Sequence, residues 1–187
     1  MSDLKLVGLC GSLRSASTNR TLMRFAATRF GAPLIEGDLR LPLYDGDLED
    51  AHGIPAEVEA LAARIRDADA VILGCPEYNG GVTGVMKNAL DWLSRVKTPV
   101  WRDKPVAILS AAAGRAGGAR AQYALRLNLV AFRPALVPGP EVLVGASYEA
   151  FDADGAPREA AAVALVDEVM AQLRTAAQQR RAKRAAA

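Results

Sequence analysis

The stretch LKLVGLCGSLRSASTNRTLMRFAATRF, residues 4–30, decides the fold. It starts as an almost unbroken apolar run to Cys10, passes through a turn rich in hydroxyl residues, and continues with Leu22, Phe25 and Ala26 at helical spacing. A short apolar run without alternation predicts a strand whose two faces are both covered, as in a parallel sheet. The stretch therefore predicts a strand over 4–10, a loop, and a helix over 19–30.

The same strand-then-helix unit recurs along the rest of the chain. Apolar runs predict further strands over 33–36, 70–74, 105–111 and 135–144, the last interrupted by Pro138 and Pro140. Amphipathic stretches predict helices over 55–66, 84–95, 120–129 and 158–181. Five such units predict an α/β fold, a flavodoxin-like three-layer sandwich whose five-stranded parallel sheet has the order 2-1-3-4-5. Such sheets bind ligands at the carboxyl ends of the strands, so the loops after strands one, three and four should hold the site.

Length and composition describe one globular domain over residues 1–187. The chain is 51% hydrophobic and 24% charged, and no apolar run reaches the ~18 residues of a membrane span. The N-terminus has no signal-peptide pattern, so we expect a cytoplasmic protein. Two isolated cysteines, Cys10 and Cys75, and one histidine, His52, exclude a disulfide framework and a zinc finger and lead us to predict no metal site. We expect both cysteines to be small buried residues in the reduced state.

The net charge of +2 is unevenly distributed along the chain. From Arg174 onward there are five cations and no acid, which leaves the rest of the chain with a net charge of −3. A mildly acidic body argues against a nucleic-acid-binding surface, which needs clustered positive charge. The basic, alanine-rich tail over about 175–187 is expected to be a frayed helix end, and contact with an anionic partner is the alternative.

The loop after the first predicted strand, GSLRSASTNR over 11–20, is suited to an anion. Hydroxyls, backbone N–H groups and the positive end of a helix dipole bind phosphate, and Arg14 adds a guanidinium. The alternative is that Ser17 or Thr18 only caps the helix, which accounts for a single hydroxyl. The loop matches neither the Walker A motif nor GxGxxG, although Glu36 and Asp38 lie where a ribose-binding acid would follow the latter. The predicted phosphate-binding residues are Ser12, Arg14, Ser17 and Asn19.

Two further loops are expected at the same edge of the sheet. The segment PEYNGG over 76–81 follows the third strand, and SAAAGRAGG over 110–118 follows the fourth. Small residues let a flat ligand approach the backbone closely. Each loop alone is unspecific, because glycine turns end many strands. Together the three loops predict a phosphate site between two backbone walls, which suits a mononucleotide with a planar head.

Three segments, GSLRSASTNR, PEYNGGVTGVMKNALDW and KPVAILSAAAGRAGGARAQ, resemble the NADPH-dependent FMN reductase family, which includes quinone, chromate and azo-dye reductases. The similarity also takes in LPLYDGDLE over 41–49 and runs from about Lys5 to Leu143. It implies a flavodoxin-like fold that holds FMN without a covalent bond and uses NADPH or NADH as co-substrate. Where relatives often carry a second serine, this chain has Ala112. The cofactor-binding residues that the resemblance implies are Ser12, Arg14, Ser17, Asn19, Pro76, Glu77, Tyr78, Asn79, Gly80, Ser110 and Gly114.

The predicted function is that of an oxidoreductase that passes hydride from NAD(P)H through bound FMN to a small acceptor, such as a quinone, a free flavin, an azo compound or chromate. Because the flavin carries the chemistry, we predict no catalytic acid or base. An FMN-binding electron carrier without its own NAD(P)H turnover is the alternative. A nucleotide-binding regulator without redox chemistry is a third candidate.

The predicted helix over 84–95 carries more apolar surface than one sheet face needs, including Val85, Met86 and Trp92. An apolar excess of this kind predicts a contact surface. The family resemblance implies dimers and tetramers, so we expect a homodimer or a homotetramer. The alternative for Trp92 is packing within one chain, under the loop over 97–103.

Overall fold

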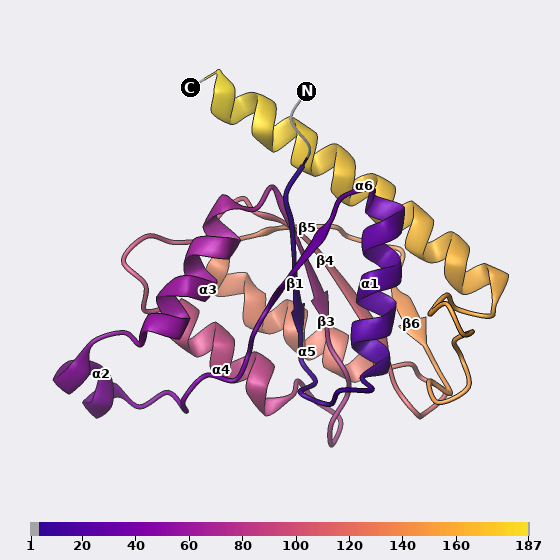
Figure 1. Ribbon diagram of the computed structural model, residues 1–187, viewed down its shortest axis with the longest axis horizontal. Coiled ribbons are helices and arrows are strands. Elements are labelled where there is room, and N and C mark those ends of the chain that lie inside the picture. The colour runs from indigo at the N-terminus through magenta and orange to yellow at the C-terminus, as the bar shows by residue number, and fades with distance from the viewer. Residues whose placement is uncertain (1–3, 187) are drawn as a thin grey trace.

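The computed structural model describes residues 4–186 and has three layers, a parallel sheet between two groups of helices (Figure 1). In chain order its elements are β1 (Leu6–Cys10), α1 (Thr18–Phe30), β2 (Leu34–Gly37), α2 (Gly46–His52), α3 (Ala56–Asp67), β3 (Ala70–Gly74), α4 (Gly84–Leu93), β4 (Pro105–Ala111), α5 (Ala119–Leu129), the 3-10 helix η1 (Val130–Phe132), β5 (Ala135–Leu136), β6 (Val142–Val144) and α6 (Ala160–Ala185). Residues 1–3, part of the N-terminus for which we predict no signal peptide, and residue 187 of the basic tail lie outside the described residues.

The strands run parallel in the order β2-β1-β3-β4-β5, and β6 also pairs with β4. The predicted flavodoxin-like order 2-1-3-4-5 is therefore confirmed. The fifth predicted strand, 135–144, is divided into β5 and β6 on either side of Pro138 and Pro140, because proline has no N–H to donate to a ladder. β5 pairs with the start of β4 at Pro105, and β6 pairs with its end at Ala111.

The three central strands bury both faces, which is why their sequences are apolar almost throughout. Alternate residues of β1 point to opposite sides of the sheet. Val7 and Leu9 pack with α3, α4 and α5, whereas Leu6 and Cys10 pack with α1 and α6. In Figure 1, α1 and α6 accordingly lie together on one side of the sheet.

Two helical segments differ from what the sequence predicts. α2 falls in a stretch for which we predict no helix; none of its residues is buried, so it has no apolar stripe to detect. α6 continues beyond the predicted end at 181 to Ala185, with Ala177 buried and Arg181 lying 3.9 Å from the Asp69 carboxylate. α6 is thus helical through Ala185, and fraying of this end stays a prediction. Within residues 4–186 no helix is both long enough and apolar enough to cross a membrane.

The apolar face of α4 is covered within the chain. Trp92 is 1% exposed, and its ring packs edge-on against Tyr44 with 5.0 Å between ring centroids. The Trp92 indole N–H donates to the Pro42 carbonyl at 2.8 Å, and Asn88 accepts from the Tyr44 N–H at 2.9 Å. The surface that we predicted to face a partner subunit is therefore buried by the segment over 39–44, and it gives no reason to expect oligomers.

Candidate active site

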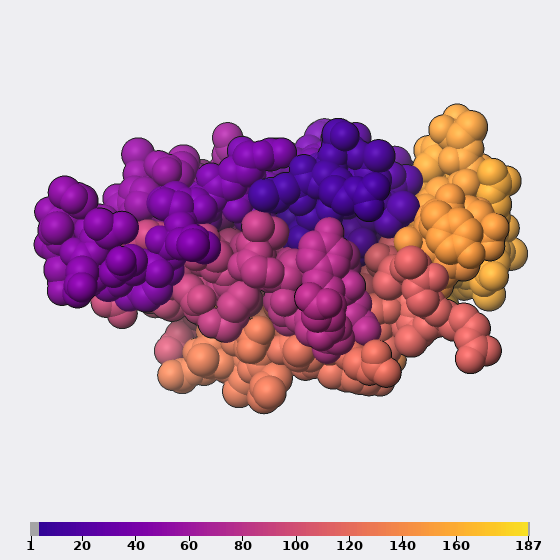
Figure 2. Space-filling view, turned by 90° about the horizontal axis from the view of Figure 1, so that it is seen from below, coloured from indigo at the N-terminus to yellow at the C-terminus, as the bar shows by residue number. Residues whose placement is uncertain are grey.

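The loops after β1, β3 and β4 meet the segment after β6 at the carboxyl edge of the sheet. Figure 2 looks onto this edge, with the indigo loop after β1 beside the magenta loop after β3. A cavity of about 420 Å³, here called the edge cavity, lies between them. Its lining residues are Ser12, Arg14, Ala16, Ser17, Thr18, Asn19, Pro76, Glu77, Tyr78, Ala111, Ala112, Ala113, Ser147 and Tyr148.

The first turn of α1 forms one end of the edge cavity. Ser17 is the N-cap residue, and its hydroxyl accepts from the Arg20 N–H at 3.3 Å, so the capping interpretation holds for this one side chain. The buried Ser12 hydroxyl accepts from the Arg14 N–H at 3.4 Å, whereas Arg14 itself is exposed. Thr18 lies at the start of the helix, where backbone N–H groups have no intrahelical acceptor. The turn thus combines hydroxyls, N–H groups and a guanidinium around one space.

Arg20, which the sequence analysis did not select, holds this loop in shape. Its guanidinium donates to the carbonyls of Arg14 at 2.6 Å and Ser12 at 3.3 Å. It also pairs with the Glu36 carboxylate at 3.0 Å, and Arg24 pairs with the same carboxylate at 2.6 Å. Glu36 is therefore engaged with two arginines, and Asp38 pairs with Arg40, so neither acid stands ready for a ribose.

Asn19 joins α1 to the end of β4. Its side chain is buried, Nδ2 donates to the Ala111 carbonyl at 2.7 Å, and Oδ1 accepts from the Ala111 N–H at 3.0 Å. Both polar atoms of the amide are thus bonded to backbone. Asn19 was predicted to bind phosphate; it lines the edge cavity, but its side-chain amide is engaged in holding two of the walls together.

The loop after β3 ends in a tight turn over residues 78–81. Tyr78 and Gly81 exchange backbone hydrogen bonds of 3.3 and 3.1 Å. Asn79 and Gly80 both have positive φ, 53° and 74°, which is the pattern of a type I′ turn and the reason why an Asn-Gly pair occupies it. Tyr78 is 49% exposed at the mouth of the cavity, whereas Asn79 and Gly80 are not among the lining residues.

Glu77 links the loop after β3 to α5. Its Oε2 accepts from the N–H groups of Arg120 at 3.1 Å and Ala121 at 3.4 Å, and its Oε1 lies 3.3 Å from the Arg120 guanidinium. A carboxylate in this place satisfies free N–H groups at a helix start and complements the helix dipole. Pro76 and Glu77 are thereby fixed as a wall of the edge cavity.

Two predicted residues of the loop after β4 lie outside the cavity lining. The buried Ser110 hydroxyl donates to the Gly117 carbonyl at 2.6 Å and accepts from Gln122 at 3.2 Å, so it faces α5. Gly114 is exposed, and a Cβ added there would meet nothing within 4 Å. Instead the next residues of the loop, Ala111–Ala113, form the wall.

Two further residues, Ser147 and Tyr148, line the edge cavity from the segment after β6 and were not predicted from the sequence. Backbone hydrogen bonds of 3.0 Å from Ala112 to Val144 and 3.1 Å from Ser147 to Ala112 bring this segment to the edge. The signal was available, because a hydroxyl and an aromatic residue follow the strand end at Val144 as the other loop residues follow theirs. The predicted strand end at 144 agrees with the structure, but only the loops after strands one, three and four were expected to hold the site, so this segment was left out.

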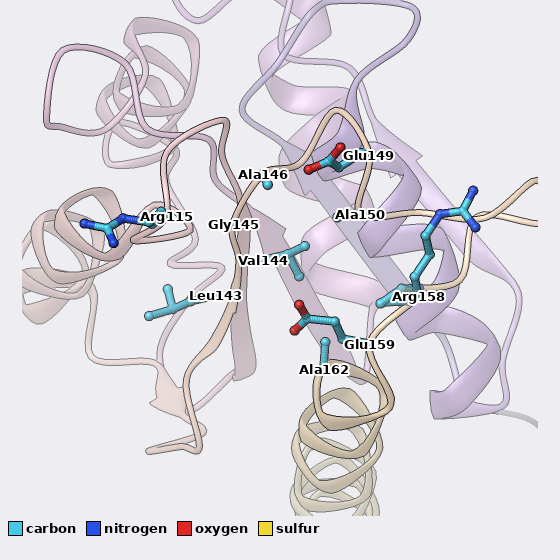
Figure 3. A pocket seen from close by; sticks show the side chains of 11 residues that line it. Arg115, Leu143, Val144, Gly145, Ala146, Glu149, Ala150, Arg158, Glu159 and Ala162 are labelled. Carbon is cyan, nitrogen blue, oxygen red and sulfur yellow. The ribbon is translucent and has the colours of Figure 1, made fainter.

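A second cavity of about 430 Å³ adjoins this segment, between β6 and the start of α6 (Figure 3). The carboxylates of Glu149 and Glu159 extend toward it, whereas the guanidinium of Arg158 extends away from it. Two carboxylates repel a phosphate. Of the two cavities, the edge cavity is therefore the one whose donors suit a phosphate ester.

The two cysteines lie below the edge cavity at the ends of β1 and β3, and both are free and buried. The Cys10 thiol lies 3.5 Å from the Ser17 hydroxyl. Burial raises the pKa of the Cys75 thiol to about 12, although a hydrogen bond from the Thr83 backbone opposes the shift. A thiol of this kind is not an attacking group at neutral pH.

Comparison with known proteins agrees with this geometry. The family model of the NADPH-dependent FMN reductases matches residues 4–149. An NAD(P)H-dependent FMN reductase of Pseudomonas aeruginosa is 43% identical over 156 residues, covering 82% of this chain and 84% of the relative. A quinone reductase of Escherichia coli K12 is 43% identical over 146 residues, covering 76% of this chain and 78% of the relative.

Among solved structures, the flavoenzyme NAD(P)H:(acceptor) oxidoreductase FerB of Paracoccus denitrificans has a TM-score of 0.83 at 29% identity, covering 94% of this chain and 98% of that one. The residues that line the edge cavity all lie within the segment that the family model matches. The chain belongs to the NADPH-dependent FMN reductase family.

Proposed function

We propose that this chain binds FMN in the edge cavity and passes hydride from NADPH or NADH to a small acceptor, with quinones as the first class to test and free flavins, azo compounds and chromate as the others. The observation that carries the proposal is the shape of the edge cavity. Phosphate-type donors gather at the α1 end, and the alanines of 111–113 together with Pro76 form walls with small side chains. A relative that is 43% identical is a quinone reductase, which supports quinones as the first class to test.

The residues present fit FMN. A volume of about 420 Å³ falls within the range of small-molecule sites. The Ser12 and Ser17 hydroxyls, the N–H groups at the start of α1 and the Arg14 guanidinium are suited to a phosphate. Ala111–Ala113 and Pro76 present small side chains, and the Glu77 carboxylate is bonded to the start of α5, so a flat ring can lie against these walls.

Bound FMN supplies the hydride chemistry, since a flavin ring both accepts and gives up a hydride. The chain itself holds the phosphate, orients the ring and closes one side of it to water. Glu77 is the one carboxylate that lines the edge cavity within the described residues, and it is engaged with the start of α5. No proton transfer by a side chain is therefore assigned. Tyr78, half exposed at the mouth, is placed to contact whatever lies over the ring.

We further propose a homodimer or homotetramer, now with α5 as the contact surface. Tyr123, Leu127 and Val130 are 57%, 73% and 67% exposed and follow one another at helical spacing, so they form an apolar stripe on the outer face of α5 and η1. A stripe of large apolar side chains in water favours association with a like surface. We also propose a cytoplasmic location, because the co-substrate is NAD(P)H and both cysteines are free thiols.

The proposed activity is tested with the purified chain alone. An absorbance spectrum of oxidised flavin, followed by steady oxidation of NADPH that accelerates when a quinone is added, supports an enzyme. A yellow protein that oxidises NADPH only when a separate reductase is supplied would identify an electron carrier instead. A colourless protein that takes up no added FMN would contradict both.

A further inference from the structure

Another concave site lies at the opposite edge of the sheet from the edge cavity. It is a cleft of about 620 Å³ between the C-terminal half of α6 and the starts of β4 and β5, here called the basic cleft. In Figure 1 this part of α6, in yellow, passes the end of the sheet where the strands begin. The lining residues are Arg102, Asp103, Pro105, Ala135, Ala176, Gln179, Arg180, Lys183 and Arg184.

The charges of the basic cleft are of one sign. Four cations line it against the single carboxylate of Asp103. Arg180, Lys183 and Arg184 have the i, i+3, i+4 spacing that places them on one face of α6. Like charges so spaced repel one another, so the arrangement costs free energy unless an anion lies among them.

Arg180 gives a second, independent observation that points to an anionic ligand. Its Nη1 is buried and has no hydrogen-bond partner among the described residues. Burial and the neighbouring Arg184 lower the pKa of the Arg180 guanidinium, although Asp69 and Asp103 oppose the shift. An unpaired buried N–H of a charged group is costly, and a ligand oxygen would remove that cost.

The environment of Lys104 shows that the positive potential extends below the cleft. Lys104 is fully buried, and its ammonium donates to the carbonyls of Arg66 and Ala68. Burial, and after it Arg180 and Arg184, lower the pKa of this ammonium to about 7, with Asp69 and Asp67 opposing. Lys104 therefore lies close enough to Arg180 and Arg184 for their charges to act on it.

Cations near a helix C-terminus can also serve simply to complement the helix dipole. That role needs neither burial nor a cleft, and its effect is confined to the last turn. Arg180 lies more than one turn before Ala185. Helix-dipole complementation therefore does not account for Arg180.

We propose that the basic cleft binds a small anion carrying two or more phosphate-type charges, such as a pyrophosphate group, free or as part of a nucleotide. The size favours a small molecule, because about 620 Å³ is typical of small-ligand sites. A long nucleic acid is disfavoured, because the chain outside the tail carries a net charge of −3. This site is separate from the flavin reaction and does not depend on it.

The test uses the protein saturated with FMN, so that the phosphate end of the edge cavity is already filled. Inorganic pyrophosphate and ADP are titrated separately by calorimetry, and the thermal unfolding midpoint is recorded with and without each. We expect one saturable site, weakened by salt, and a raised unfolding midpoint. Equal affinities for the two probes identify bare polyphosphate as the recognised group, and a higher affinity for ADP identifies a nucleotide.

Arg180→Gln and Lys183→Gln should each weaken pyrophosphate binding by about tenfold or more, because each removes a charge-assisted contact. Lys97→Gln, which removes an exposed cation outside the cleft, is the matched control and should bind as the unchanged chain does. Lys183 lies near the helix end, which keeps the test valid if Arg180→Gln fails to fold.

Three results would overturn the assignment. The first is the absence of both saturable heat and any midpoint shift in the unchanged chain. The second is binding that persists in both Arg180→Gln and Lys183→Gln but is lost in Arg14→Gln, which would locate the anion in the edge cavity. The third is a DNA duplex that binds through Arg180 and Lys183 more tightly than ADP, which would assign the cleft to nucleic acid.

Discussion

The side-chain amide of Asn19 and the backbone of Ala111 form a reciprocal pair, with Nδ2 donating to the carbonyl at 2.7 Å and Oδ1 accepting from the N–H at 3.0 Å. The two residues come from the start of α1 and the end of β4. Their pairing fixes the distance between the phosphate end of the edge cavity and one of its walls. A single side chain thus joins two loops that are far apart in the sequence.

Asn19→Ala should lower the free energy of unfolding by about 2–4 kcal/mol, because it leaves a buried N–H and a buried carbonyl unpaired. FMN affinity should fall with it, because the wall loses its anchor. Urea unfolding and flavin-fluorescence titration measure the two effects. Thr28→Ala, on the exposed side of the same helix, is the control and should stay within about 0.5 kcal/mol. An Asn19→Ala protein as stable as the unchanged chain would remove the structural role.

Arg14→Ala should weaken FMN binding by about one to two decades, since a charge-assisted hydrogen bond contributes roughly 1.5–3 kcal/mol. Stability without FMN should hardly change, because Arg14 is exposed. Arg24→Ala is the matched control, because it also removes one arginine, and Arg24 does not line the edge cavity. Equal FMN affinities for the two variants would show that Arg14 does not contact the phosphate.

Gly11→Ala should reduce FMN occupancy and stability together. A Cβ at this position would lie 2.7 Å from Thr83 Oγ1 and 3.2 Å from Pro76 Cδ, so the loop after β3 must shift. Overpacking of this kind costs roughly 1–3 kcal/mol. Gly114→Ala is the matched control, because its Cβ meets open space. The ratio of flavin to protein absorbance in purified samples reports occupancy, and equal ratios would contradict the crowding argument.

The buried Lys104 should make stability rise with pH from about 7 upward. The pKa of its ammonium is about 7 in the folded chain against 10.5 for an ordinary lysine, so above pH 7 the unfolded chain binds more protons than the folded one. Deprotonation of Lys104 removes a buried positive charge, and with it the repulsion from Arg180 and Arg184. The measurement is kept below the ordinary thiol pKa of 9, because the raised pKa of Cys75 makes stability fall above that value.

Urea unfolding at pH 7 and pH 8.5 tests this linkage. The unchanged chain should gain stability between the two pH values, and Lys104→Met should lose most of that gain even if it is less stable overall. Lys97→Met, at an exposed lysine, should keep the gain. Identical pH dependence in the Lys104→Met and unchanged chains would show that Lys104 titrates normally.

Leu127→Asp should convert the proposed oligomer to a monomer, because it puts a charge in the middle of the apolar stripe of α5. Leu43→Asp, at a leucine that is 81% exposed but not on α5, should leave the assembly unchanged. Light scattering coupled to size exclusion gives the mass of each. A mass near 20 kDa for the unchanged chain would refute the oligomer altogether.

The sequence by itself determined the architecture. The strands at 70–74 and 105–111 are found with the predicted bounds, because a strand covered on both faces must be apolar along its whole length. The strand order and the edge that carries the site follow from the number of β-α units and from the rule on strand ends. That rule selected the loops of Ser12, Arg14 and Tyr78, and the chemistry of the loop residues together with the family resemblance selected the side chains, which line the edge cavity.

Only the tertiary structure decided which way individual side chains face. In a fully buried strand both faces are apolar, so the sequence did not reveal that Ser110 points to α5 while Ala111 lies at the edge cavity. Likewise, the cover over Trp92 comes from the segment over 39–44, and Arg180, whose buried Nη1 has no partner among the described residues, lies beside the starts of β4 and β5. Periodicity reports how a segment is buried, whereas contacts between distant segments depend on how the whole chain packs.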